Sequence, residues 1–177
     1  DVISLSGGDN TVQGNSGTDS FTVSGGTNVI DGGADNDTIT LNDGFNTVNA
    51  GTGDDSITAN SGTNTIATDG GANTVVLAGG INSVTASTGA DSITATGGDN
   101  TIDSGAGANV IALNGGSNSV TGGADADRIT TTSGTNIVNA GEGMDTIVLN
   151  GGTNTVNAQA GVDTITATLG SNIIDAG

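Results

Sequence analysis

A period of 18 residues runs through the whole chain without insertion or deletion, and it constrains the fold more than any other feature. In every complete repeat the second position is Gly, the fourth is Asn and the sixth is Val or Ile. The repeats begin at residues 7, 25, 43, 61, 79, 97, 115, 133, 151 and 169. Such strict periodicity predicts identical structural units stacked in register.

Alternation of apolar and polar residues predicts two short strands in each repeat, around positions 3–7 and 13–17, joined by Gly-rich turns. Each strand is too short to be stable alone, but stacked coils can pair their backbones at a spacing of about 4.8 Å. We therefore predict an all-β, single-domain parallel β-solenoid, or β-roll, of about ten 18-residue coils covering residues 1–177. At this spacing the rod would be roughly 50 Å long, and we expect it to belong to a longer repeat array.

Charge and residue types exclude several classes of function. The chain has nineteen acidic residues and one basic residue, Arg128, which argues against nucleic-acid binding because phosphate contacts need Lys and Arg. No segment is apolar enough to suggest membrane insertion. His, Cys, Tyr and Lys are absent, so the many Ser and Thr residues lack an ordinary base partner. Because each coil carries similar acids and no unique cluster interrupts the pattern, we predict that the chain is not an enzyme.

One half of each repeat carries a recognisable nonapeptide at positions 8–16. Examples are GGADNDTIT at Gly32–Thr40, AGTGDDSIT at Ala50–Thr58, GGADADRIT at Gly122–Thr130 and AGEGMDTIV at Ala140–Val148. These segments resemble the motif G-G-x-G-x-D-x-U-x of the repeats-in-toxin (RTX) family, the hemolysin-type calcium-binding repeats. The resemblance implies a right-handed β-roll that binds Ca²⁺ through turn carbonyls and the motif aspartate. It also implies a secreted bacterial toxin, enzyme, adhesin or surface-layer protein.

The chain departs from the RTX pattern in two ways. The other half-repeat, such as LNGGSNSVT at Leu113–Thr121, has Asn where the family has Asp. Within the matching half-repeat, Asn73 and Asn109 replace the aspartate. The sequence therefore predicts calcium on one edge of the solenoid only, in a row interrupted at these two coils.

The acidic residues concentrate on that edge. Eight aspartates at position 13 and five acids at positions 9–12 account for thirteen of the nineteen. Neighbouring carboxylates at the coil spacing would repel by about 1 kcal/mol in water and about 3–4 kcal/mol at an effective dielectric near 20. Bound Ca²⁺ would reverse the sign of this interaction, whereas the alternative is that turn amides donate to the carboxylates and solvent screens them. The predicted metal ligands are Asp1, Asp19, Asp37, Asp55, Asp91, Asp127, Asp145 and Asp163.

The opposite edge carries the unbroken column of position-4 asparagines. An inward-facing Asn can donate to one neighbour and accept from the other, so we predict an uncharged amide ladder that needs no ion. The invariant Gly at position 2 is expected to supply a positive φ in the adjoining turn.

The outward positions of the second strand are rich in threonine, as in Thr38/Thr40 and Thr164/Thr166. A flat Thr-x-Thr array is typical of ice-binding β-solenoids, although Thr is also simply a favourable residue for an exposed strand. Val110/Ala112 and Arg128 interrupt the array. Ice binding is therefore the alternative function.

These features together predict a non-catalytic structural module that Ca²⁺ folds and stiffens. We expect it in an adhesin, surface-layer, matrix or filament protein. The RTX resemblance implies a location outside the cell or on the bacterial surface and export by type I secretion. The expected partners are calcium and other copies of the chain, associated end to end or laterally.

Overall fold

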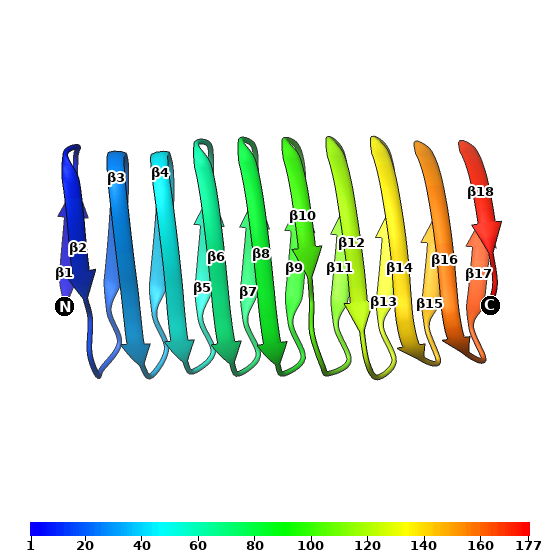
Figure 1. The fold of residues 1–177 in the computed structure, drawn as a ribbon, viewed down its shortest axis with the longest axis horizontal. Coiled ribbons are helices and arrows are strands. Elements are labelled where there is room, and N and C mark those ends of the chain that lie inside the picture. The colour runs from blue at the N-terminus through cyan, green and yellow to red at the C-terminus, as the bar shows by residue number, and fades with distance from the viewer.

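The computed structural model describes residues 1–177 as a stack of coils with eighteen strands and no helix. It therefore contains no helix that could span a membrane. The coils stand side by side along one axis, with the two ends of the chain at opposite ends of the rod (Figure 1). All strand pairs are parallel, and partners such as Asn82 and Asn100 are 18 residues apart. The predicted all-β parallel solenoid is confirmed.

One side of the rod, here face A, contains the second strand of each repeat. Its strands begin at position 14, directly after the position-13 residue, as in Ser56, which follows Asp55. Face A consists of β1 (Val2–Leu5), the first parts of β3 (Ser20–Ala34) and β4 (Thr38–Thr52), β5 (Ser56–Ala59), β7 (Thr74–Leu77), β9 (Ser92–Ala95), β11 (Val110–Leu113), β13 (Arg128–Thr131), β15 (Thr146–Leu149) and β17 (Thr164–Ala167).

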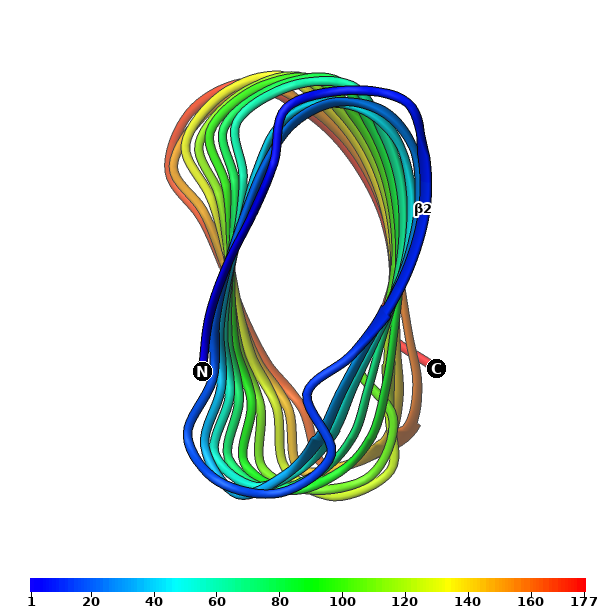
Figure 2. The same ribbon diagram turned by 90° about the vertical axis from the view of Figure 1, so that its left-hand side faces the viewer.

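The other side, face B, contains the first strand of each repeat. It consists of β2 (Asp9–Gln13), the later parts of β3 and β4, β6 (Thr63–Gly70), β8 (Ile81–Thr88), β10 (Asp99–Asp103), β12 (Ser117–Gly123), β14 (Thr135–Gly143), β16 (Thr153–Gly161) and β18 (Ser171–Asp175). Several of these strands run past position 7 because the turn backbone keeps pairing between coils, as in Gly33 with Gly51. Viewed along the rod, the chain traces a closed outline that rotates gradually from coil to coil (Figure 2).

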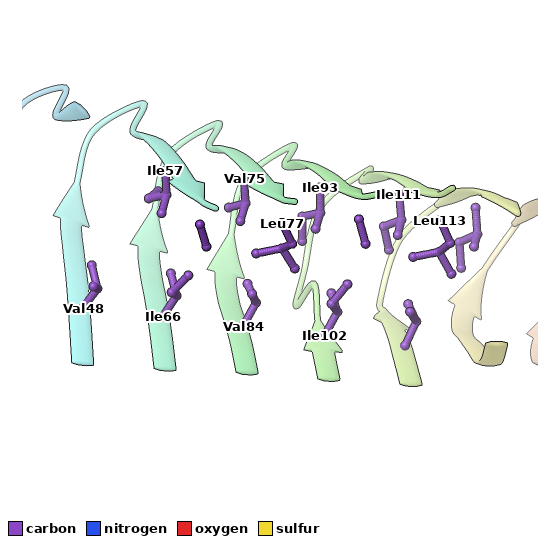
Figure 3. Packing of buried hydrophobic residues seen from close by; sticks show 14 of the residues in the cluster. Val48, Ile57, Ile66, Val75, Leu77, Val84, Ile93, Ile102, Ile111 and Leu113 are labelled. Carbon is purple, nitrogen blue, oxygen red and sulfur yellow. The ribbon is translucent and has the colours of Figure 1, made fainter. Parts of the chain in front are cut away.

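The core is a thin layer of aliphatic side chains between the two faces. Ile57, Ile93 and Ile111 from face A lie opposite Ile66 and Ile102 from face B (Figure 3). All of these side chains are at most 1% exposed. Their rows continue through a single cluster of 26 buried residues. Because every side chain in a row repeats at the coil spacing, burial in one coil depends on the coils above and below it.

Candidate functional site

The position-13 aspartates lie in one column at the corner that leads into face A, and we call this column the aspartate seam. Successive members are joined by contacts between residues 18 positions apart. Asp163 is half-buried and Asp1 is exposed. The other members are at most 2% exposed, namely Asp19, Asp37, Asp55, Asp91, Asp127 and Asp145.

In every buried carboxylate after Asp19, one oxygen accepts a backbone hydrogen bond from the neighbouring coil, whereas Asp19 Oδ1 pairs with the terminal ammonium group of Asp1. The amide of Asp19 donates to Asp37 Oδ1 at 2.7 Å, and the amide of Asp37 donates to Asp55 Oδ1 at 2.8 Å. The amide of Asp127 donates to Asp145 Oδ1 at 2.8 Å. The sequence left open whether turn amides, in place of calcium, satisfy the aspartates. These amide hydrogen bonds are present, but they satisfy only Oδ1.

The second oxygen, Oδ2, is buried without a hydrogen-bond partner. This holds for Asp19, Asp37, Asp55, Asp91, Asp127, Asp145 and Asp163. An unsatisfied buried polar atom costs about 1–3 kcal/mol, and a charged one costs more. Repetition of that cost along the seam implies that a proton or a cation occupies the place beside Oδ2.

The surroundings of Oδ2 contain a second acceptor. A side-chain carbon added to Gly14 would clash with both Asp19 Oδ2 and the carbonyl oxygen of Gly32, one coil further on. At Gly122, the corresponding clashes are with Asp127 Oδ2 and the next position-8 carbonyl. Carboxylate and carbonyl oxygens thus converge beside position 8, and we call the space between them the seam slot.

The two asparagines in the same column show what this slot requires. Asn73 and Asn109 accept backbone amides through Oδ1, as the aspartates do. Their Nδ2 atoms, however, donate to the backbone, at 3.1 Å to the carbonyl of Gly71 and at 3.2 Å to the carbonyl of Ser104. Where the second polar atom is a donor, the protein satisfies it without an ion.

The position-4 asparagines on the opposite edge form the predicted ladder, which we call the asparagine seam. From Asn10 to Asn172, each Nδ2 donates to the Oδ1 of the next coil at 2.7–2.9 Å. Nδ2 also donates to a position-1 carbonyl, as from Asn82 to Gly79 at 3.0 Å. This edge is self-sufficient, so the predicted asymmetry between the two edges is present in the structure.

Burial makes five of the seam carboxylates harder to ionise when no cation is bound. Desolvation raises the pKa of Asp37, Asp55, Asp91 and Asp145, and it raises the pKa of Asp127 to about 7. The accepted backbone amide lowers each pKa and opposes this effect only in part. A bound cation would restore the ionised form.

The acids at positions 9–12 do not join the buried column. Asp35, Asp54 and Asp125 are exposed. Each accepts an amide from the adjacent coil, with Ala72 N donating to Asp54 Oδ1 at 2.8 Å. These residues add negative potential to the edge.

The seam residues fit a hard cation that binds mainly backbone oxygens. Ca²⁺ takes about 6–8 oxygen ligands from carboxylates and carbonyls. No three acidic side chains lie close enough together to hold a metal ion alone. Backbone carbonyls would therefore contribute to the coordination, and the position-8 carbonyls that face Oδ2 of Asp19, Asp37 and Asp127 are available for it.

The family model that describes four copies of the RTX calcium-binding nonapeptide repeat matches five successive segments of the chain, residues 4–39, 40–75, 78–111, 113–147 and 148–177. The chain belongs to the RTX calcium-binding nonapeptide repeat family. No curated protein and no solved structure matches the chain. Since RTX nonapeptides are calcium-binding motifs, Ca²⁺ is the cation that the repeats are built to bind.

The structure shows which oxygens of the seam lack a protein donor and are available to calcium. The position-13 aspartates would hold the ion through Oδ2, together with turn carbonyls of adjacent coils. Bound Ca²⁺ would supply positive charge between coils and satisfy oxygens for which the protein offers no donor.

One part of the site was missed from the sequence. Position 8 was not predicted to be part of the site, although the missing side chain of Gly14 and Gly32 leaves room beside Oδ2, and the position-8 carbonyl of the next coil faces that space. The signal that could have revealed this role is the nature of position 8 in the two coils that carry Asn73 and Asn109.

Two open hollows lie elsewhere, on the outer side of face B, with volumes of about 380 and 490 Å³. The lining of the first includes Thr65, Ser83, Thr101 and Ser119. Neither hollow includes a seam aspartate.

Proposed function

We propose that the chain is a non-catalytic structural module of a secreted bacterial surface protein, such as an adhesin, surface-layer, matrix or filament protein, wound and stiffened by Ca²⁺ along the aspartate seam. The observation that carries this proposal is the run of buried Oδ2 atoms without donors, repeated in seven coils. RTX repeats form a structural family, and the seam geometry supports a mechanical role for the ion.

In the proposed mechanism, ion binding drives winding. Without Ca²⁺, adjacent carboxylates repel each other and their Oδ2 atoms lose hydration on burial. With Ca²⁺, the same atoms become ligands that join one coil to the next. Because the folded chain binds the ion and the unfolded chain binds it poorly, stability rises with Ca²⁺ concentration. The module would stay loose where Ca²⁺ is scarce and wind after export.

Circular dichroism with and without chelator tests this proposal. We expect the β signal and the melting temperature to fall in excess EDTA and to recover when Ca²⁺ is restored in excess over the chelator. Mg²⁺ at the same concentration serves as the control, because it demands a tighter octahedral shell and should restore less. An unchanged signal and melting temperature in EDTA would overturn the proposal.

The location and assembly state belong to the same proposal. RTX repeats typify secreted bacterial proteins, and we propose type I secretion as the route. We also propose self-association, end to end or lateral, supported by exposed apolar side chains on face B such as Phe45 and Ile81, which are 65% and 59% exposed. Sedimentation velocity over a hundredfold range of concentration, with Ca²⁺ present, tests association.

Ice binding remains the second candidate, and one observation favours it. Thr22, Thr40 and Thr58 pair in direct register on face A, so three consecutive coils present an ordered row. The row is then broken by Val76 and, two coils further on, by Ala112. Thermal hysteresis that disappears when Thr40 is replaced by a bulky residue would support this function, and its absence at high concentration would remove it.

A further inference from the structure

Positions 8 and 13 vary together from coil to coil. In seven of the nine coils that contain both, position 13 is Asp and position 8 is Gly or Ala. In the other two, position 13 is Asn and position 8 carries a hydroxyl, as Thr68 with Asn73 and Ser104 with Asn109. Both hydroxyl-bearing residues are fully buried.

The structure gives a physical reason for this pairing, because the two positions border the same seam slot. In the coil of Asn109, the Ser104 hydroxyl donates to the carbonyl of Gly122 at 2.6 Å. In the coils of Gly14 and Gly32, the corresponding position-8 carbonyl faces Oδ2. Meanwhile, Asn109 Nδ2 replaces that Oδ2 and donates to the carbonyl of Ser104. Two protein donors thus do the work of a cation: Asn109 Nδ2 replaces the acceptor Oδ2, and the Ser104 hydroxyl satisfies the next coil's position-8 carbonyl, which faces Oδ2 in the coils of Gly14 and Gly32.

The coil of Asn73 uses the same substitution less completely. Asn73 Nδ2 donates to the carbonyl of Gly71 at 3.1 Å. The Thr68 hydroxyl oxygen is buried without a hydrogen-bond partner. In this coil only the Asn73 amide donates a hydrogen bond, and the buried Thr68 hydroxyl donates none.

We propose that the pairs Thr68/Asn73 and Ser104/Asn109 are built-in substitutes for Ca²⁺, which make the middle of the rod independent of the ion. They divide the aspartate seam into a block of Asp19, Asp37 and Asp55 and a block of Asp127, Asp145 and Asp163. Asp91 stands alone between them. This inference rests on the proposed calcium function and adds that only the two outer blocks unwind when calcium is removed.

The spacing of charge supports this division. In the middle of the seam, aspartates and asparagines alternate. Asn73 lies between Asp55 and Asp91, and Asn109 lies between Asp91 and Asp127. Like charges there are two coils apart, which is about 10 Å at the usual coil spacing, close to the screening length at about 0.1 M salt. In the outer blocks they are adjacent. The middle coils therefore carry less repulsion for an ion to relieve.

Exchanging the pairs tests the proposal on the whole chain. We expect Ser104→Ala with Asn109→Asp to raise the number of Ca²⁺ ions bound per chain, measured by equilibrium dialysis, by about one, and to lower the melting temperature in EDTA. The matched single variant Asn109→Asp retains the Ser104 hydroxyl in the slot, so it should gain less calcium. An unchanged ion count in the double variant would overturn the proposal.

The reverse exchange, Ala140→Ser with Asp145→Asn, covers the case in which the first double variant does not fold. It should reduce the ion count by about one and raise the melting temperature in EDTA. An unchanged ion count here would also overturn the proposal.

Amide hydrogen exchange in EDTA gives an independent reading in the unmodified chain. The amide of Asp91, which donates to asparagine Oδ1 in the middle of the rod, should exchange at least tenfold more slowly than those of Asp19 and Asp127, which donate to carboxylates in the outer blocks. Equal exchange along the seam would overturn the proposal. If the unmodified chain binds no Ca²⁺, the proposed function and this inference both fail; if it binds Ca²⁺ but the exchanged pairs leave the count unchanged, only the inference fails.

Discussion

At the scale of single residues, the two oxygens of a seam aspartate have different roles. Oδ1 closes a backbone hydrogen bond between coils, which any acceptor of this shape can do, as Asn73 and Asn109 show. Oδ2 has no protein partner, so it is the atom on which calcium dependence rests. The difference between Asp and Asn at position 13 is therefore a difference in what must fill one slot.

Without calcium, stability should rise as the pH falls, and Asp127 should contribute most clearly. Burial raises its pKa from 3.8 to about 7 in the folded chain. The stability contributed by its protonated form is fully present below the unfolded pKa and is lost as the pH rises through the folded pKa. Urea unfolding in EDTA should therefore show a higher midpoint at pH 5 than at pH 7.5.

Asp127→Asn is the control for this pH profile, because an amide cannot ionise. It should flatten the profile between pH 5 and 7.5. With saturating Ca²⁺ the slope should reverse, since a proton competes with the ion for Oδ2. A midpoint in EDTA that falls on acidification over this range would contradict the assignment.

At the scale of the structural element, the turn before each face B strand depends on glycine at position 2. All ten have positive φ, from 79° to 101°, so the expectation from the sequence is confirmed. A side chain on Gly98, for example, would also clash with the carbonyl of Gly80 in the preceding coil. Backbone conformation and close coil stacking thus select glycine independently.

Gly98→Ala should lower the free energy of unfolding by about 2 kcal/mol or more, since the left-handed backbone alone costs about 1–2 kcal/mol. Gly70→Ala is a matched control, because its φ is not positive and the nearest atom to the added carbon is Thr88 Oγ1 at 3.7 Å. That variant should change stability by less than about 1 kcal/mol. Urea unfolding in excess Ca²⁺ measures both, and equal losses would contradict the role given to position 2.

At the scale of the whole molecule, charge is distributed unevenly around the rod. The net charge is −18, and thirteen acids lie at positions 9–13 on one edge. The opposite edge is held by the neutral asparagine seam. Repulsion between like charges is therefore concentrated along the aspartate seam.

Added salt should stabilise the chain in EDTA more than in calcium. At about 0.01 M ionic strength the screening length is about 30 Å, which spans several coils, whereas at about 0.5 M it is on the order of one coil spacing. The melting temperature in EDTA should therefore rise clearly between these two NaCl concentrations. In saturating Ca²⁺, where the seam charges are paired, the rise should be smaller. Equal rises would contradict the placement of the repulsion on the seam.

The 18-residue period and the one-sided acidity were sufficient to predict the solenoid, its two strands per coil, the amide ladder and the column of aspartates. These features depend on contacts between equivalent positions of adjacent coils, so a fixed period determines them. The partnership between positions 8 and 13 depends on the tertiary structure, because they meet only when the turn closes. The turn places Gly14 against Asp19 Oδ2, and it places the Ser104 hydroxyl on the next coil's carbonyl. Only the folded turn decides which carboxylate oxygen lacks a donor, since that depends on which backbone amides it brings within reach.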